Sequence, residues 1–367
     1  MFNRGRMILM IVLLILVLPA LSMAGTVDLP QTGQVTCYDA VGSVIACPST
    51  GQDGDILAGV SWPLPRFTDN GDGTVTDRLT RLIWLQDAHC FGKRIGTTWT
   101  QALSDANSLA DPSCSLTDGS TAGDWRLPNV NELESLINAE INTATWLNGQ
   151  GFTNVQASFY WSSSTRVENK FFAWFVDFWR GHVDVSLKKF SYKVWPVRAS
   201  TTLPAEIWDT GQVTSYDARD DGALERGIEW HTPRFTDNSD GTVTDNLTGL
   251  IWLRNANCFG VRLWTQALSE ANSLADPSCS LTDGSAAGDW RLPNRKEFHS
   301  LTDFSQYNPA LRSDHPFANV KSNYYWSSST YAIVTQFAWD VNMYDGLVDY
   351  DSKLYFGGYV WPVRAGH

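Results

Sequence analysis

An internal repeat constrains the fold of this chain more than any other feature of its sequence. The segment PRFTDNGDGTVTDRLTRLIWLQDAHCFG, Pro65 to Gly92, returns as PRFTDNSDGTVTDNLTGLIWLRNANCFG, Pro233 to Gly260. A second segment, 99–129, returns almost unchanged at 264–294. Long-range self-similarity of this kind indicates repeated copies of one structural unit. Any fold assigned to the chain must therefore occur twice.

The N-terminus precedes the repeat and has the pattern of a signal peptide. Arg4 and Arg6 come before an uninterrupted apolar run, and small residues lead to a cleavage site after Ala24. The run is shorter than the roughly 20 residues that a membrane-spanning helix needs. We therefore expect export, to the periplasm, the cell surface or the medium, with no stable membrane insertion after cleavage. The expected parts are a signal peptide at 1–24, a first domain at 25–200, a linker at 201–204 and a second domain at 205–367.

The charge of the chain limits its partners. Its 27 basic and 39 acidic residues give a formal net charge of −12. A negative field of this size disfavours nucleic acid, anionic membranes and sulfated polysaccharides as ligands. Neutral ligands and cations remain compatible with it.

Six cysteines follow the cleavage site, and an even number in an exported chain is typical of disulfides. Four of them occupy matching positions in the two copies. Of the other two, Cys47 lies in an insertion that the second copy lacks, and Ser215 stands where Cys37 does. A zinc site is the alternative, but the spacings lack paired C-x-x-C units and the histidines do not cluster. The pairs predicted by the repeat are Cys37–Cys47, Cys90–Cys114 and Cys258–Cys279.

The hydrophobic pattern predicts the same elements in each copy. Residues 66–85 have the short strands and Asp/Asn-Gly turns of a β-meander. Apolar residues at helical spacing predict a helix over 98–110, and Asn129 with Glu132 predicts a capping box at the start of a second helix. Alternation around Arg180 predicts a later hairpin. The order β-β-β-α-α-β-β-β-β gives an α+β domain with two helices between sets of antiparallel strands.

Four motifs recur in the same order in both copies: FTDNGDGTVTDxLTxLIWL or its close variant, GDWRLPN, YWSSST and WPVRA. Together they resemble the Lcl C-terminal domain family, a bacterial domain family of unknown function. The WRLP helix start, the W-S-S-S strand and the closing strand are also similar to the C-type-lectin-like fold of formylglycine-generating enzymes. The resemblance implies two tandem C-type-lectin-like domains whose N- and C-terminal strands pair.

The resemblance also carries functional expectations. The founding member of the family is an adhesin for sulfated glycosaminoglycans, which implies carbohydrate binding at a cell surface. This chain lacks a basic excess and collagen-like repeats, so the sulfated ligand does not carry over. The formylglycine-generating enzymes use a late pair of reactive cysteines. No cysteine follows Cys114 in the first copy or Cys279 in the second, so that activity does not carry over either.

The acidic turn of each meander has two interpretations. Oxygen-bearing side chains at alternating positions with a glycine at the bend resemble half of a calcium loop. A hairpin turn in which Asp and Asn bond their own backbone is the alternative, and such runs are ordinary turn chemistry. The twelfth position of a full loop falls on Thr80 and Thr248 rather than on glutamate. Calcium is thus the one candidate cofactor, with Asp69, Asn70, Asp72, Asp77, Asp237, Asn238, Asp240 and Asp245 as its candidate ligands.

Seventeen tryptophans are many for this length. Those that recur in apolar strands indicate core positions, each with an indole N–H that needs a partner. The repeat comparison assigns no counterpart to Trp62, Trp146 or Trp179. Of these, Trp146 and Trp179 are the candidate ligand contacts, with simple packing as the alternative. The recurring set is Trp84, Trp125, Trp161, Trp174 and Trp195, matched by Trp252, Trp290, Trp326, Trp339 and Trp361.

No catalytic constellation stands out. The histidines share no position between copies, and the serine runs lack a G-x-S-x-G elbow. Arg126 of WRLP and Arg198 of the closing strand lie among apolar residues, which favours ion pairs with Asp124 or Glu132 over a catalytic role. Arg291 and Arg364 are their counterparts in the second copy, and ion pairs with Asp289 or Glu297 are favoured for the same reason.

Three hypotheses follow. The leading one is an exported, non-catalytic module that binds a glycan or a protein at the cell surface or in the periplasm. The second is a cell-envelope enzyme, which would need a deep pocket with two convergent carboxylates of perturbed pKa. The third is a structural or assembly protein with an exposed apolar patch. Specificity is expected in the loops that differ between copies, 138–156 and 303–320.

Overall fold

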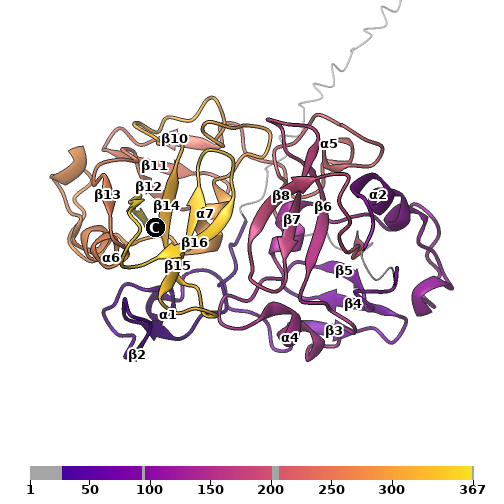
Figure 1. The fold of residues 1–367 in the computed structure, drawn as a ribbon. Coiled ribbons are helices and arrows are strands. Elements are labelled where there is room, and N and C mark those ends of the chain that lie inside the picture. The colour runs from indigo at the N-terminus through magenta and orange to yellow at the C-terminus, as the bar shows by residue number, and fades with distance from the viewer. Residues whose placement is uncertain (1–26, 93–95, 201–205, 366–367) are drawn as a thin grey trace, which may run out of the picture.

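The computed structural model describes residues 27–92, 96–200 and 206–365 (Figure 1). The predicted signal peptide, 1–24, and the linker, 201–204, lie outside these residues. Each copy consists of a lead-in segment followed by the motif-bearing body of the repeat. In the first copy the lead-in is 27–62 and in the second 206–230.

The body of the first copy follows the predicted order with one α-helix and one 3-10 helix added, and its lead-in contributes further elements. A short hairpin and a single-turn helix occupy its lead-in. The meander, the two predicted helices, an added helix and four strands come next. They are β1 (Cys37–Tyr38), β2 (Val44–Ile45), α1 (Asp53–Ile56), β3 (Phe67–Asp69), β4 (Thr74–Asp77), β5 (Leu82–Leu85), α2 (Trp99–Ser108), η1 (Ser113–Ser115), α3 (Val130–Glu134), α4 (Thr143–Asn148), β6 (Phe159–Thr165), β7 (Phe172–Asp177), β8 (Val183–Leu187) and β9 (Val197–Ala199).

The second copy repeats this plan without a counterpart of α4 and with two additional short strands. Its elements are α5 (Asp221–Leu224), β10 (Phe235–Asp237), β11 (Thr242–Asp245), β12 (Ile251–Leu253), β13 (Val261–Arg262), α6 (Trp264–Ser273), η2 (Ser278–Ser280), α7 (Arg295–Ser300), β14 (Tyr324–Thr330), β15 (Phe337–Asn342), β16 (Val348–Ser352), β17 (Gly358–Tyr359) and β18 (Val363–Arg364). The chain is therefore an α+β protein of two tandem regions.

The predicted capping boxes, closing-strand pairs and disulfides are present in the structure. Asn129 caps α3 and Glu132 closes the capping box, as Asn294 and Glu297 do for α7. The closing strand of each copy pairs antiparallel with the third strand of its own meander, β9 with β5 and β18 with β12. The three predicted disulfides are all formed, and the described residues contain no free cysteine.

The arginines of the WRLP motifs form the predicted buried ion pairs. Arg126 contacts Glu132 through two hydrogen bonds of 2.6 Å, and Arg291 binds Glu297 in the same forked geometry. The arginines of the closing strands find other partners than those predicted. Arg198 pairs with Asp118 at 2.9 Å and Arg364 with Asp283 at 3.1 Å. These aspartates lie in the loop that precedes WRLP and are brought to the closing strand only by the folded chain.

The recurring tryptophans form the core, as their position in apolar strands predicts. The indole N–H groups of Trp161, Trp195, Trp326 and Trp361 donate to backbone carbonyls, and those of Trp125 and Trp290 donate to serine hydroxyls. Trp195 donates to Leu85 at 2.7 Å and so ties the closing segment to the meander. Trp84, Trp252 and Trp339 depart from the expectation, because their buried N–H groups have no hydrogen-bond partner among the described residues. These ten side chains are scaffold.

The two copies share one sheet, which the repeat alone does not predict. Strands β6, β7 and β8 of the first copy continue through β16, β15, β14, β17 and β13 of the second (Figure 1). The joint is a single antiparallel pair, Val183 opposite Val348. Both valines are buried, and one apolar core cluster contains residues of both copies. The sheet therefore runs through the junction between the copies rather than ending at it.

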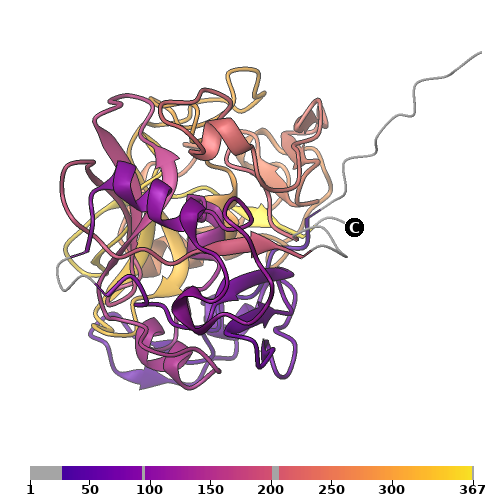
Figure 2. The same cartoon turned by 90° about the vertical axis from the view of Figure 1, so that its right-hand side faces the viewer.

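Each lead-in packs against the body of the other copy. Figure 1 shows α1 of the first lead-in below β15 and α5 of the second beside β6. The second lead-in also lies beside helix α2 in Figures 1 and 2, where Thr100 donates a 2.8 Å hydrogen bond to Asp217. The boundaries 25–200 and 205–367 thus follow the repeat in the sequence, whereas the packing gives each lead-in contacts with both copies.

A buried polar network secures each exchanged lead-in, and it is the same in both places. The hydroxyl of Ser164 donates a 2.5 Å hydrogen bond to Asp221, and the side-chain amide of Gln212 bonds both backbone groups of Thr165. In the other direction Ser329 donates to Asp53 at 2.5 Å. The YWSSST serines, which lack catalytic partners, therefore anchor the lead-in of the opposite copy.

Buried charges add to the junction. Glu134 of α3 pairs with Arg295 at 3.3 Å and with Lys296 at 3.1 Å, both on α7 of the other copy. All three side chains are about 1% exposed. Burial lowers the pKa of Lys296 to about 8 despite the neighbouring carboxylate. A charged side chain this deeply buried strongly destabilises the folded state when its partner of opposite charge is removed.

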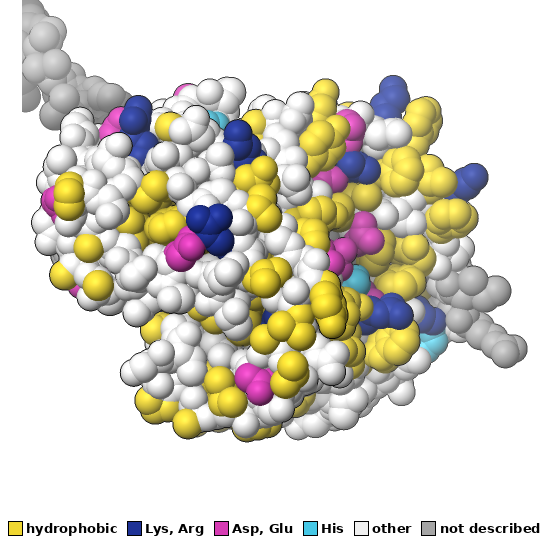
Figure 3. All heavy atoms as spheres, turned by 60° about the vertical axis from the view of Figure 1, so that its left-hand side comes forward, with side chains coloured by type: hydrophobic (Ala, Val, Ile, Leu, Met, Phe, Trp, Pro, Cys, Tyr) yellow, Lys and Arg dark blue, Asp and Glu magenta, His cyan; other side chains and the backbone are white. Residues whose placement is uncertain are grey.

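No helix among the described residues is long and apolar enough to cross a membrane. Figure 3 shows one face of the molecule, on which the basic side chains are few and scattered. That face offers no broad basic surface of the kind that binds nucleic acid.

We predict that Glu134→Ala destabilises the whole chain by about 3–5 kcal/mol, because it leaves two buried cations without a counter-charge. Urea unfolding followed by tryptophan fluorescence measures the free energy. Asp237→Ala is the control, since it breaks an exposed pair with Arg254 and should cost less than about 1 kcal/mol. Equal costs for the two variants would contradict the assignment of Glu134 to the junction.

We also predict that Asp53→Asn with Asp221→Asn flattens the pH dependence of stability. Burial raises the pKa of Asp53 to about 6 and that of Asp221 to about 7. A carboxyl whose folded pKa is raised contributes stability that is lost as pH rises through that pKa. The wild-type protein should therefore lose on the order of a few kcal/mol between about pH 4 and pH 8. Urea titrations across this range test it, and an unchanged slope in the double variant would refute it.

Candidate functional site

The copies share their scaffold, so a ligand site that belongs to one copy should lie where the copies differ. Such a difference surrounds a pocket of about 560 Å³ in the second copy. Its walls are lead-in residues 209–213 and 225–232 and the loop 303–313. This volume is within the range of about 300–1,000 Å³ that small-ligand sites occupy.

Trp230 forms the aromatic wall of the pocket. Its indole N–H donates to the carbonyl of Asp209 at 3.2 Å, and the side chain is 7% exposed. The guanidinium of Arg234 lies behind the ring, 4.2 Å from its centre, and is itself paired with Asp245. The ring is therefore held from behind and lies in the wall of the pocket.

The first copy builds the same wall and packs a second tryptophan on it. Trp62 corresponds to Trp230, donates to the carbonyl of Gln31 at 2.8 Å, and has Arg66 behind it. Trp146 of helix α4 then packs on Trp62, with 5.0 Å between ring centres. In the second copy the equivalent stretch is not helical, and Asn308 has a left-handed φ of 55° that a helix does not allow. Trp230 therefore lacks a counterpart of Trp146, although it is more buried than Trp62.

Four carboxylates line the open pocket, and every one of them replaces a neutral residue of the first copy. Two are partly or fully buried and two lie exposed at the rim. The replacements, from first to second copy, are Gln31 to Asp209, Leu57 to Glu225, Ser61 to Glu229 and Asn138 to Asp303. Arg312 is the one basic residue in the lining, and it is paired with Asp314 at 2.9 Å.

The two deeper carboxylates converge on Gly211. The backbone N–H of Gly211 donates to Asp209 at 2.9 Å. A Cβ at this glycine would lie 2.5 Å from a carboxylate oxygen of Asp303 and 2.9 Å from the ring of Trp230. With φ of +80° and no room for a side chain, the position requires glycine. Gly211 thus allows both acids and the tryptophan to meet at one point.

In each of these two carboxylates, the hydrogen bonds from described residues reach one oxygen only. Oδ1 of Asp303 accepts hydrogen bonds from the N–H of Ser305 at 2.8 Å and from its hydroxyl at 2.6 Å. Among the described residues, no hydrogen bond reaches Oδ2 of Asp303 or Oδ2 of Asp209. Asp303 is only 4% exposed, so its free oxygen belongs to the pocket rather than to bulk solvent.

Burial raises the pKa of both acids. Burial raises the pKa of Asp209 to about 6, the charge of Asp303 adds to the rise, and Arg234 opposes it. The pKa of Asp303 is raised by burial as well, while the bonds from Ser305 hold it down. Two neighbouring carboxyls with raised pKa can bind cations and hydroxyl groups, and they can also exchange protons with a ligand.

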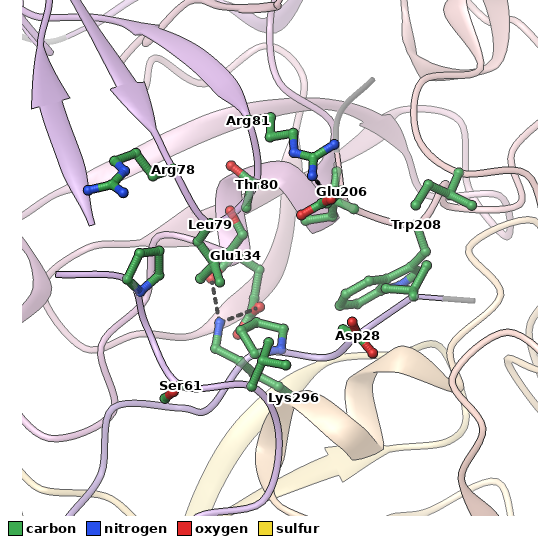
Figure 4. A pocket seen from close by; sticks show the side chains of 17 residues that line it. Asp28, Ser61, Arg78, Leu79, Thr80, Arg81, Glu134, Glu206, Trp208 and Lys296 are labelled. Atoms are coloured by element: carbon green, nitrogen blue, oxygen red, sulfur yellow. Dashed lines mark hydrogen bonds and ion pairs between the residues drawn. The ribbon is translucent and has the colours of Figure 1, made fainter. Parts of the chain in front are cut away.

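A second cavity, of about 410 Å³, lies at the junction of the copies. Figure 4 shows Glu134 and Lys296 on one side of it and Trp208 on the other, with the pair Arg81–Glu206 close by. Its lining residues Val27 and Glu206 directly follow segments outside the described residues. We assign this cavity to the junction and take the acidic pocket as the candidate ligand site.

The acidic turns of the meanders serve as turns, and the predicted calcium sites are not supported. Asp69 accepts the N–H of Gly71, and Asp72 accepts the N–H and hydroxyl of Thr74. Asp77 is buried against Arg66 at 2.8 Å. Among the described residues, no three His, Cys, Asp or Glu side chains are placed to hold a metal ion. The same bonds recur in the second copy, where Asn238 pairs with threonines and Asp237, Asp240 and Asp245 repeat the three roles.

The two candidate contact tryptophans have different surroundings. Trp146 is half-buried between Trp62 and Phe67 and therefore packs in the first copy. Trp179 is 50% exposed at the tip of the β7–β8 hairpin, with Arg180 stacked 3.9 Å from its ring. Neither lines the acidic pocket. Trp179 keeps its place as a candidate contact.

The comparison with family models agrees with the repeat. The model of the Lcl C-terminal domain matches residues 73–198 and again 241–364. The chain belongs to this family. A search of curated proteins and a search of solved structures each gave no match.

Each matched range begins after the lead-in of its copy, so the lead-ins lie outside the two Lcl C-terminal domains. Asp209, Glu225, Glu229 and Trp230 lie outside the matched ranges, whereas Asp303 lies inside the second. The pocket is thus built where an Lcl C-terminal domain meets the lead-in that precedes it. Family membership fixes the scaffold and leaves the pocket to be judged from its own residues.

The sequence comparison does not predict the pocket, and the reason lies in the alignment of the two lead-ins. The repeat comparison assigned no counterpart to Trp62, although Trp230 precedes P-R-F at the same distance. Aligning these two tryptophans would have brought Glu229 opposite Ser61 and shown the change of charge. The meeting of Asp303 with the lead-in has no sequence pattern, because it depends on tertiary packing.

We predict that Asp303→Asn lowers the pKa of Asp209, because it removes the neighbouring negative charge and keeps the shape that the first copy has at this position. Carboxyl-carbon NMR titration of Asp209 measures the change. Asp237→Asn, an exposed acid outside the pocket, is the control and should leave that pKa unchanged. An unaltered Asp209 titration in Asp303→Asn would show that the two acids do not interact.

Proposed function

We propose that this protein is an exported glycan-binding module whose ligand enters the acidic pocket of the second copy. One observation carries the proposal: a pocket beside Trp230 is lined by four carboxylates, each of which replaces a neutral residue at the same place in a duplicated scaffold. An aromatic side chain with a few convergent polar groups in a concave site is the usual composition of a small-ligand site.

The chemistry of the pocket suits a hydroxyl-rich ligand. Oδ2 of Asp209 and of Asp303 can each accept a hydrogen bond from a sugar hydroxyl. Ser305 and Gln306 contribute further polar groups to the lining. Sulfated glycans are unfavourable here because they would place negative charge against four carboxylates.

Export is part of the proposal. Its support is the N-terminal pattern at 1–24 and the three disulfides, which persist in oxidising compartments. The periplasm and the cell surface both satisfy this condition. A relation to the C-type-lectin-like fold also remains a proposal, supported by the pairing of each closing strand with its meander.

A second candidate function is hydrolysis of a cell-envelope glycan, and one observation favours it. Asp209 and Asp303 form the pair of neighbouring acids with raised pKa that such an enzyme would need. We rank binding above hydrolysis because both carboxylates lie on the same side of the pocket, next to Gly211. Release of shortened oligosaccharides by the wild-type protein, lost in Asp303→Asn, would move this candidate to first place.

We expect the mature protein to bind defined glycans on an array and to lose at least about tenfold in affinity when the pocket is given the residues of the first copy. The variant is Asp209→Gln, Glu225→Leu, Glu229→Ser and Asp303→Asn. Each replacement is a residue that the same scaffold already carries in the first copy. Isothermal titration with the best array ligand measures the loss.

The control is Asp237→Asn with Asp240→Asn, which removes one exposed and one half-buried acid of the second copy outside the pocket. It removes two of the four negative charges that the pocket variant removes, and it should bind like the wild type. Thermal melting of all variants establishes that they are folded. Absence of any glycan ligand, or equal binding by the pocket variant, would overturn the proposal.

A further inference from the structure

The charge balance of the acidic pocket restricts its ligand further. Four carboxylates line it, against one guanidinium that is already paired with Asp314. Arg234 lies behind Trp230, is paired with Asp245, and lowers the pKa of both Asp209 and Asp303. A site with this balance attracts positive charge and repels anions.

The depth of the acids matters as much as their number. Glu225 and Glu229 are exposed at the rim, where water screens them. Asp303 is 4% exposed, and its Oδ2 has no hydrogen-bond donor among the described residues. Oδ1 of Asp303 already accepts two hydrogen bonds from Ser305, and Arg234 and Arg312 lower the pKa of this acid, so a cationic donor would add the bond that Oδ2 lacks.

The lining also sets the size and type of the cation. No three of the described carboxylates converge as ligands of a bare metal ion. The pocket of about 560 Å³ instead has room for an organic group. Its hydroxyl and amide side chains, Ser305, Ser313, Thr232 and Gln306, can bond neighbouring ligand hydroxyls.

We infer that the ligand carries a protonated primary amine beside hydroxyl groups, as in a glycan with free, non-acetylated amino sugars, and that Asp209 and Asp303 bind this ammonium group. The inference rests on the proposed glycan-binding function and names the ligand class of the same pocket. An N-acetylated sugar has the same ring without the charge, and it would leave both buried carboxylates uncompensated.

The test compares glucosamine tetramers with N-acetylglucosamine tetramers by isothermal titration of the full mature protein at neutral pH. Each ammonium–carboxylate hydrogen bond is worth about 1.5–3 kcal/mol. The free-amine tetramer should therefore bind about 10- to 100-fold more tightly. Asp209→Gln and Asp303→Asn, tested singly and together, should reduce this preference to near unity, while Asp237→Asn should keep it.

The outcomes separate the inference from the function on which it rests. Preference for the free amine that disappears in the pocket variants supports the inference. Equal binding of both tetramers, weakened alike by the pocket variants, overturns the ammonium assignment and leaves glycan binding in place. Binding of the free-amine tetramer that persists unchanged in folded pocket variants overturns both, because simple attraction to an acidic protein would then explain it. Melting curves and the single variants guard against a misfolded double variant.

Discussion

The reciprocal docking of the lead-ins is the constraint on which the rest of this structure depends. Each lead-in inserts a buried aspartate against the W-S-S-S strand of the other copy, Asp221 against Ser164 and Asp53 against Ser329. A buried carboxylate is tolerable only if donors meet it, so both strands must present their serine at this point. The two copies are held in one arrangement because neither network closes without the opposite copy.

That arrangement explains how one chain can carry both a repeated scaffold and a single acidic pocket. The shared sheet, joined at Val183 and Val348, and the buried pair of Glu134 with Lys296 fix the bodies relative to each other. The lead-ins then lie at equivalent places beside each body. Once the position is fixed, the residues around Gly33 and Gly211 are free to differ, and they do: Trp146 packs on Trp62 in the first copy, whereas carboxylates line a pocket beside Trp230 in the second.

The sequence predicts what short-range chemistry decides and little of what packing decides. The capping boxes at Asn129 and Asn294, the Arg126–Glu132 pair and the buried tryptophans follow from spacing and residue type. The joined sheet does not, because its contact is one pair of valines that resemble any other strand residues. The acidic turns show the opposite failure. Asp77 fits a calcium pattern by spacing, yet its charge is used by Arg66, which lies eleven positions before it in the chain.

The acidic residues of the chain fall into those that the fold requires and those that it does not. Asp72 and Asp240 recur in both copies and bond the threonine two residues ahead, so their conservation between copies is explained by the turn. Asp209 and Asp303 replace amides that the scaffold accepts in the first copy, so the fold does not require their charge. They line a pocket beside Trp230, and each has an oxygen that no described residue bonds. A charge that folding does not need, held away from water at a raised pKa, destabilises the native state unless something binds it. The ligand proposed above would supply the reason for its presence that the scaffold does not.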